Sequence, residues 1–410
     1  MNEWHTKPIH VMVMKKNRSF SFTILSLLLV VGCHGQKNDQ ATRQTKIGGP
    51  CDGCEVMYID MPKAIKPVDT SAGWHEAGQK LWITGKVWQK DGSTPAADVI
   101  IYYYQTDHEG RYSPKPGMDK RASIHGHIRG WVKTDKEGNY SIYTIVPAPY
   151  TGRKTPAHIH ILIREPGLEN EYYIDDLVFD DDPLLTAAMR RSMKNRGGNG
   201  ILRVVHKGSL QIAEHDIILG LNIPGYPETK KEALMPGLNV GEESPSFMPY
   251  HAWGSDKGTR SCPLCKYGRY LGVLYFVGHQ PNWLEIKEWL LFLEKENKQR
   301  DHFLRVFLIY GNETGFSKER RIRELEKIGK ELNLQRVALT FVPSMNDAAS
   351  EVNGYKIDPA ADNTFIVYKN RKVVYRQVNL KPSLVNFQRL SSVLDKATSP
   401  FFNLPASSHD

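Results

Sequence analysis

The stretch PYTGRKTPAHIHILIR, from Pro149 to Arg164, joins a histidine pair to a run of β-branched residues. Successive side chains of a β-strand point to opposite faces. His158 and His160 are therefore expected on one face of a strand, with Ile159 on the other. Two imidazoles at this spacing can bind one metal ion, and the upstream Tyr150 can add a phenolate oxygen. We place the chemistry of the protein in this stretch.

Short strand patterns surround this stretch on both sides, separated by turns rich in Gly and Asp. The segments with these patterns are 81–88, 99–104, 131–134, 140–146, 158–164, 172–179, 201–205 and 211–219. Many short strands at close spacing are typical of an all-β sandwich. We expect this sandwich over residues 76–227.

A different pattern follows a predicted linker over 228–258, which is rich in Pro, Gly and Ser. Strand and helix patterns then alternate, over 271–277, 283–295, 304–310, 318–332, 337–342, 364–378 and 383–394. This alternation predicts an α/β domain over 259–400, and its element order resembles the thioredoxin fold. The expected protein is thus multidomain, an all-β sandwich followed by an α/β thioredoxin-like domain.

The start of the chain has the pattern of an export signal. A basic segment at 15–18 precedes an apolar run at 20–31 and then Cys33, and the run is too short to span a bilayer as a mature helix. The pattern resembles a bacterial lipobox, so we expect residues 1–36 to be a signal region with Cys33 lipidated, and 37–75 to be a tether. The predicted location is the bacterial cell envelope, exported to the periplasm and membrane-anchored. The alternative is a plain secretory signal.

The remaining cysteines form two Cys-x-x-Cys pairs, Cys51 with Cys54 and Cys262 with Cys265. In an exported protein the first interpretation is two local disulfides. The alternative is one zinc site with two thiolates from each pair. Both interpretations stay open on the sequence alone.

The thioredoxin-like domain lacks cysteines where the chemistry of that fold needs them. A redox-active member carries Cys-x-x-Cys after the first strand, where the helix N-terminus lowers the thiol pKa. Here that place is 278–283, GHQPNW, and no proline directly precedes 364–368. We therefore predict a binding or structural role for this domain.

The charge balance does not indicate a nucleic-acid partner. Lys+Arg 54 against Asp+Glu 45 give a formal net charge of +9. The basic residues are spread along the chain and no basic-aromatic motif accompanies them. We predict no nucleic-acid binding.

Tyr112, which follows the strand pattern at 99–104, extends the candidate metal site. With Tyr150, His158 and His160 it makes a set of two phenolates and two imidazoles. Anionic oxygen ligands suit hard Fe(III), and imidazole suits iron as well. A site of this kind would need an electron-rich substrate that binds as a dianion. A second same-face pair, His125 and His127, is expected to line a pocket.

Ordered motifs from 81 to 224 carry a family resemblance. They are the segment 81–87, DHEGRY at 107–112, RGWVKTD at 129–135, TIVPAPY at 144–150, PAHIH at 156–160 and the run 179–183. At these residues the chain resembles the intradiol ring-cleavage dioxygenases of the catechol and protocatechuate 3,4-dioxygenase type. The resemblance implies a β-sandwich that holds non-haem Fe(III) through Tyr112, Tyr150, His158 and His160.

The same resemblance implies an activity. A small aromatic diol of the catechol class would chelate the iron and displace Tyr150, and O2 would be inserted between the two hydroxylated carbons. The product would be a muconate-type diacid, so the enzyme would be an oxidoreductase that incorporates both oxygen atoms into a single donor. The alternative is a non-catalytic ligand-binding sandwich fused to a thioredoxin-like module.

The sequence departs from the family pattern at two places. Thr155 stands where the family usually has an arginine that stabilises charge on the substrate, and Arg153 is our candidate substitute. Asp175 and Asp176 stand where the family often carries Thr-Gln, which brings a carboxylate close to the site.

Overall fold

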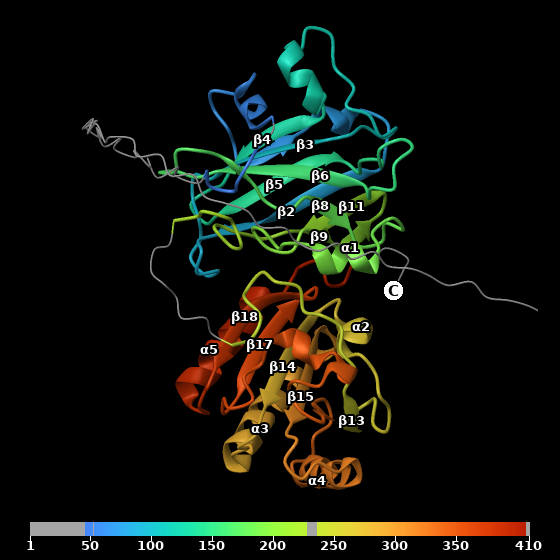
Figure 1. Ribbon diagram of the computed structural model, residues 1–410, viewed down its shortest axis with the longest axis vertical. Helices are drawn as coiled ribbons and strands as arrows, with labels where there is room; N and C mark the ends of the chain where they lie inside the picture. Colours follow the sequence, from blue (N-terminus) through green and yellow to red (C-terminus); the bar gives the residue numbers. More distant parts are fainter. Residues whose placement is uncertain (1–45, 52, 228–235, 407–410) are drawn as a thin grey trace, which may run out of the picture. The chain divides into compact units, whose positions relative to one another are not determined.

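The computed structural model describes residues 46–51, 53–227 and 236–406 (Figure 1). The predicted signal, the predicted lipidation site Cys33 and the first part of the predicted tether lie outside these ranges. Within them, no helix is long and apolar enough to cross a membrane.

Two β-sheets form the expected β-rich domain (Figure 1). One has the strand order β1-β5-β2-β11-β10, with β12 paired to β2, and the other has the order β4-β3-β6-β8-β9, with β7 paired to β6. The bounds are β1 (Val68–Thr70), β2 (Lys80–Trp88), β3 (Ile100–Gln105), β4 (Arg129–Lys133), β5 (Asn139–Ile145), β6 (His158–Arg164), β7 (Tyr172–Tyr173), β8 (Leu177–Phe179), β9 (Ile201–Leu202), β10 (Val204–Lys207), β11 (Leu210–Glu214) and β12 (Ile217–Ile218). Helix α1 (Ala187–Ser192) and the 3-10 helix η3 (Lys120–His125) lie in loops.

Strand β6 decides which face of the second sheet carries the site. Ile159, Ile161 and Ile163 are buried in the core between the sheets. Because side chains alternate, His158 and His160 point to the outer face, as the sequence predicted. The neighbouring strand β3 places Tyr104 directly opposite His160.

The tether prediction is wrong for residues 46–51 and 53–75, which fold onto the sandwich. Strand β1 pairs in parallel with β5, and the 3-10 helices η1 (Cys54–Tyr58) and η2 (Ala72–His75) flank it. Met57 is fully buried, and its carbonyl accepts a hydrogen bond from the Trp131 indole at 2.8 Å. Apolar burial holds this segment against the sheet.

The C-terminal part is an α/β domain around one six-stranded sheet of order β13-β16-β15-β14-β17-β18. Strands β14, β15 and β16 are parallel, and β17 and β18 run antiparallel next to β14. The bounds are β13 (Tyr250–Trp253), α2 (Pro263–Tyr267), β14 (Leu271–Val277), α3 (Trp283–Arg300), η4 (Asp301–Phe303), β15 (Leu304–Gly311), α4 (Lys318–Glu331), β16 (Ala338–Val342), η5 (Ala348–Ser350), η6 (Val352–Tyr355), β17 (Thr364–Lys369), β18 (Lys372–Val378) and α5 (Leu384–Ala397).

The linker prediction for 228–258 is wrong for its second half. Strand β13 pairs with β16 at the edge of the sheet, and Phe247 is fully buried in the core of the domain. The Pro- and Gly-rich composition concealed the apolar residues that anchor this segment.

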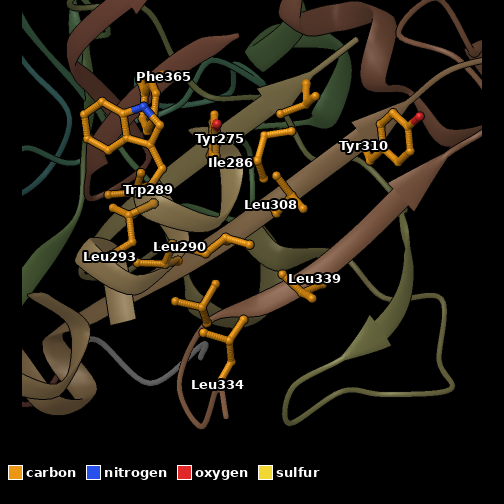
Figure 2. Packing of buried hydrophobic residues seen from close by; sticks show 14 of the residues in the cluster. Tyr275, Ile286, Trp289, Leu290, Leu293, Leu308, Tyr310, Leu334, Leu339 and Phe365 are labelled. Carbon is orange, nitrogen blue, oxygen red and sulfur yellow. The ribbon is translucent and has the colours of Figure 1, made fainter. Parts of the chain in front are cut away.

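Every residue of β14 is buried because both faces of the sheet are covered. Helices α3, α4 and α5 contribute side chains to the core on one face. Figure 2 shows Trp289 of α3 beside Phe365 of β17, with ring centroids 4.7 Å apart. The Tyr275 ring stacks on the other side of Phe365 at 4.3 Å.

One buried carboxylate stabilises this domain. Glu294 of α3 accepts hydrogen bonds from the backbone amides of Gln335, Arg336 and Val337 at 3.0–3.2 Å. Burial opposes ionisation, but these bonds outweigh it and hold the pKa of Glu294 below its usual range. The lowered pKa means that this stabilisation is present at neutral pH and is lost as pH falls through the lowered value.

Glu294→Gln is expected to lower the free energy of unfolding by about 1–3 kcal/mol at pH 7, because the new amide NH2 faces backbone donors. The difference in unfolding free energy between wild type and variant should shrink in acid, where the wild-type carboxyl is protonated. Urea titrations at both pH values measure this, with Glu288→Gln on the exposed side of the same helix as control. Equal stability of the two variants at pH 7 would contradict it.

Candidate metal centre

Tyr112, Tyr150, His158 and His160 come together on the outer face of the second sheet. The hydroxyl oxygens of Tyr112 and Tyr150 are 2.9 Å apart. The Tyr150 oxygen lies 3.0 Å from His158 Nε2 and 3.4 Å from His160 Nε2. The other three donor atoms thus lie within 3.4 Å of the Tyr150 oxygen, and the four residues come from one strand and two loops.

The two tyrosine loops are bound to each other, which explains how residues distant in sequence meet. The Thr106 hydroxyl donates to the Ala148 carbonyl at 2.7 Å, and the Ala148 amide donates to the Asp107 carbonyl at 3.1 Å. At the tip, Gly110 has φ +80, and a Cβ there would lie 2.1 Å from the Pro149 carbonyl oxygen. Only glycine allows this approach.

Asp107 shapes the loop that carries Tyr112. One carboxylate oxygen accepts hydrogen bonds from the backbone amides of Glu109 and Arg111, and the other accepts from the Ser113 hydroxyl at 2.6 Å. This is an Asx turn extended by one side-chain bond. The sequence analysis missed this role, although an Asp two residues before a Glu-Gly turn is a signal for it.

Both histidines present Nε2 to the Tyr150 hydroxyl and have an acceptor at Nδ1. His158 Nδ1 lies 2.8 Å from the Pro156 carbonyl oxygen, and His160 Nδ1 lies 2.8 Å from Asp176 Oδ1. A carbonyl or carboxylate oxygen only accepts, so each Nδ1 carries the hydrogen. The Nε2 lone pairs are therefore free for a metal ion.

The electrostatics of the set favour a bound cation. Burial, followed by the hydrogen bond to Tyr150, raises the pKa of the Tyr112 hydroxyl, and burial lowers the pKa of His158. Without a bound ion, the Tyr112 hydroxyl and the His158 imidazole are therefore both neutral. A positive ion among them would favour phenolate formation, and a set of two oxygens and two imidazoles fits iron.

Aromatic rings support His160 from behind. The Tyr104 ring stacks on the His160 ring with centroids 4.5 Å apart. The other face of the Tyr104 ring stacks on His125, with centroids 3.6 Å apart. The place of Tyr104 opposite His160 depends on strand pairing, so no local sequence pattern reveals it. Burial lowers the pKa of His125 to about 3, which keeps this imidazole neutral.

The His125 and His127 pair does not line an open pocket as predicted. His125 is buried, and its Nδ1 lies 2.9 Å from the Tyr102 hydroxyl. His127 Nε2 lies 2.8 Å from a Glu76 carboxylate oxygen. Both histidines therefore have structural partners, Tyr102 for His125 and Glu76 for His127.

Arg153 lies at the exposed edge of the centre, with its guanidinium 5.7 Å from the centre of the Tyr150 ring. Thr155, where the family usually has arginine, is half-buried. The structure therefore brings Arg153 next to one member of the ligand set, over its ring face.

The structure pairs Cys51 with Cys54 and Cys262 with Cys265 as local disulfides. Cys54 is buried against Tyr102 and Tyr104, and both Cys51 and Tyr112 pack on this same cluster. The first disulfide thus packs against tyrosines beside the candidate centre.

In the described part of the chain, one group of His, Cys, Asp or Glu residues lies close enough to share a metal ion. It consists of His158, His160 and Asp176.

Comparison with known proteins supports a dioxygenase-family domain. Residues 57–208 match the family model described as Dioxygenase, and this range contains both tyrosines and both histidines. The match begins at η1, in agreement with the packing of that segment on the sandwich.

Two curated relatives are similar to this part of the chain. Catechol 1,2-dioxygenase 2 of Acinetobacter lwoffii is 29% identical over 147 residues, which are 28% of this chain and 50% of that protein. A chlorocatechol 1,2-dioxygenase of Pseudomonas putida is 32% identical over 121 residues, 25% of this chain and 45% of that protein. The chain spans about half the length of the curated relatives it matches.

Solved structures give fainter matches. The 3-chlorocatechol 1,2-dioxygenase of Rhodococcus opacus has 23% identity and a TM-score of 0.30, and covers 38% of this chain and 67% of its own. An intradiol ring-cleavage dioxygenase of Tetranychus urticae has 20% identity and a TM-score of 0.29, and covers 42% and 92%.

Proposed function

We propose that the protein is a non-haem Fe(III) intradiol dioxygenase that cleaves a catechol-class diol between its hydroxylated carbons to a muconate-type diacid. The observation that carries this proposal is the convergence of the Tyr150 hydroxyl on Tyr112, His158 and His160 within 2.9–3.4 Å. The match of residues 57–208 to the dioxygenase family supports it.

Tyr112, Tyr150, His158 and His160 would hold the ion, which when bound supplies Lewis-acid activation of a diol toward O2. His158 is well held, because it is buried and its Nδ1 is hydrogen-bonded to the Pro156 carbonyl just before its strand. Tyr150 is half-buried on a loop. We assign it the role of moving aside for the substrate and taking a substrate hydroxyl proton on its oxygen.

Arg153 is the proposed source of positive charge beside the substrate, because its guanidinium already lies over the Tyr150 ring and Thr155 cannot supply charge. For the rest of the chain, we propose export and membrane anchoring through Cys33. We further propose that the α/β domain is thioredoxin-like and has a binding or structural role, because 278–283 contains no cysteine.

Ferric reconstitution of the purified protein tests the proposed function. We expect one iron per chain, a visible tyrosinate-to-iron charge-transfer band, and O2 uptake with at least one member of a catechol panel to give a diacid product. His158→Ala should lose iron and band together, whereas His108→Ala, at an exposed turn residue, should keep both.

A colourless wild-type protein after reconstitution would contradict the metal assignment. A coloured protein that consumes no O2 with any catechol would support the ferric site and contradict the proposed ring cleavage. Product analysis by mass spectrometry separates intradiol cleavage from simple oxidation to a quinone.

A further inference from the structure

The two histidines of the candidate centre have different partners at Nδ1. His158 donates to the Pro156 carbonyl, whereas His160 donates to the Asp176 carboxylate, both at 2.8 Å. A charged acceptor forms the stronger hydrogen bond. His160 therefore has a stronger hydrogen bond at Nδ1 than His158, and Asp176 causes this difference.

We propose that Asp176 is a positioning residue that fixes the tautomer and ring orientation of His160 and makes it the more electron-donating imidazole. The effect on the metal rests on the proposed function. The effect on the imidazole does not, because it follows from the hydrogen bond in the chain itself.

The geometry shows that Asp176 orients His160 and does not join it as a ligand of the same ion. The two nitrogens of an imidazole point away from each other on opposite edges of the ring. Asp176 Oδ1 lies at Nδ1, and the tyrosine hydroxyl lies at Nε2. An ion held by Nε2 is therefore on the far side of the ring from this carboxylate.

The backbone around Asp176 is held in place. Strand β8 pairs with β6 through His158 and Val178, and through Ile159 and Leu177. Asp176 directly precedes β8, so its side chain reaches His160 from the neighbouring chain segment. A Cβ at Gly200 would lie 2.4 Å from the Asp176 carbonyl oxygen, so the next strand also packs tightly on it.

The adjacent Asp175 has a separate task, which makes it a matched control. Its carboxylate accepts a hydrogen bond from the Asn195 amide at 2.7 Å, and its own amide donates to the Arg196 carbonyl at 3.1 Å. Asp175→Asn removes one negative charge next to Asp176 and keeps an acceptor for Asn195. It leaves the His160 bond untouched.

The carboxylate has a defined consequence for a bound ferric ion. By accepting the hydrogen bond from Nδ1–H, the Asp176 carboxylate raises the basicity of Nε2. A more basic ligand stabilises Fe(III) more than Fe(II) and makes the iron a weaker acceptor of tyrosinate charge. Removing the charge should therefore raise the reduction potential and move the visible band to longer wavelength.

The first experiment uses the full chain without metal. Long-range proton–nitrogen NMR of histidine-labelled protein, assigned through His160→Ala, reports the tautomer of His160. We expect the Nδ1–H form in the wild type, in Asp176→Asn and in Asp175→Asn, and a mixture containing the Nε2–H form in Asp176→Ala. An unchanged Nδ1–H form in Asp176→Ala overturns the proposal.

The second experiment uses the ferric protein. Asp176→Ala should bind Fe(III) about 10–100-fold more weakly, the usual effect of losing a partner of a metal-binding histidine. Asp176→Asn should raise the potential and shift the band, and Asp175→Asn should do so much less. Equal shifts in the two asparagine variants would show an effect of charge alone and overturn the assigned role.

The two experiments separate this inference from the proposed function. If wild-type protein takes up no ferric iron, the proposed function fails while the tautomer measurement still decides the role of Asp176. If wild-type protein is coloured and neither measurement responds to Asp176→Ala, the proposed function stands and this inference fails.

Discussion

Protein carrying both Tyr112→Phe and Tyr150→Phe is expected to show no visible charge-transfer band after ferric loading and to bind Fe(III) about a hundredfold more weakly or worse. Loss of a supporting partner alone costs 10–100-fold, and here two anionic donors are removed. Their hydroxyl oxygens are 2.9 Å apart, so the double variant removes two adjacent oxygen donors from one place. Absorption spectra and iron titrations measure both effects.

The single variants are expected to differ. Tyr150→Phe should keep a weaker band from Tyr112 but lose O2 uptake, because we assign Tyr150 the role of accepting the substrate proton. Tyr112→Phe should lose most of the iron affinity. Tyr143→Phe, within β5 of the other sheet, is the matched control and should behave as wild type. A band of wild-type intensity in the double variant would contradict the ligand assignment.

Gly110→Ala is expected to reduce Fe(III) affinity by about 10–100-fold, in the range of lost ligand support, although position 110 contributes no ligand. Its Cβ would lie 2.1 Å from the Pro149 carbonyl oxygen, so the Tyr150 loop must move away from Tyr112. An L-residue at φ +80 also carries a backbone cost of about 1–2 kcal/mol.

Gly117→Ala isolates the backbone cost. Gly117 has φ +82 and nothing within 4 Å of its Cβ position, so this variant should lose stability without losing iron affinity. Thermal denaturation and iron titration of both variants separate the two effects. If Gly110→Ala binds iron as tightly as Gly117→Ala, the contact between the loops does not position the centre.

Local patterns predicted most of the fold. Alternation in 158–164 placed His158 and His160 on one face, because the pleat of a strand depends only on neighbouring residues. The helix at 283–295 followed in the same way from its apolar spacing. The predictions failed for residues 46–51 and 53–75 and for the second half of 228–258. There Pro and Gly obscure the few apolar residues, such as Met57 and Phe247, that anchor irregular segments.

The sequence by itself determined which residues are the candidate donors, because the types and order of Tyr112, Tyr150, His158 and His160 can be read from it. Only the tertiary structure decided what surrounds these donors. Tyr104 meets His160 through the register of β3 and β6, and Asp176 meets it from the segment before β8. Those contacts depend on which strands pair, and strand pairing is set by the packing of the whole sandwich rather than by any local pattern.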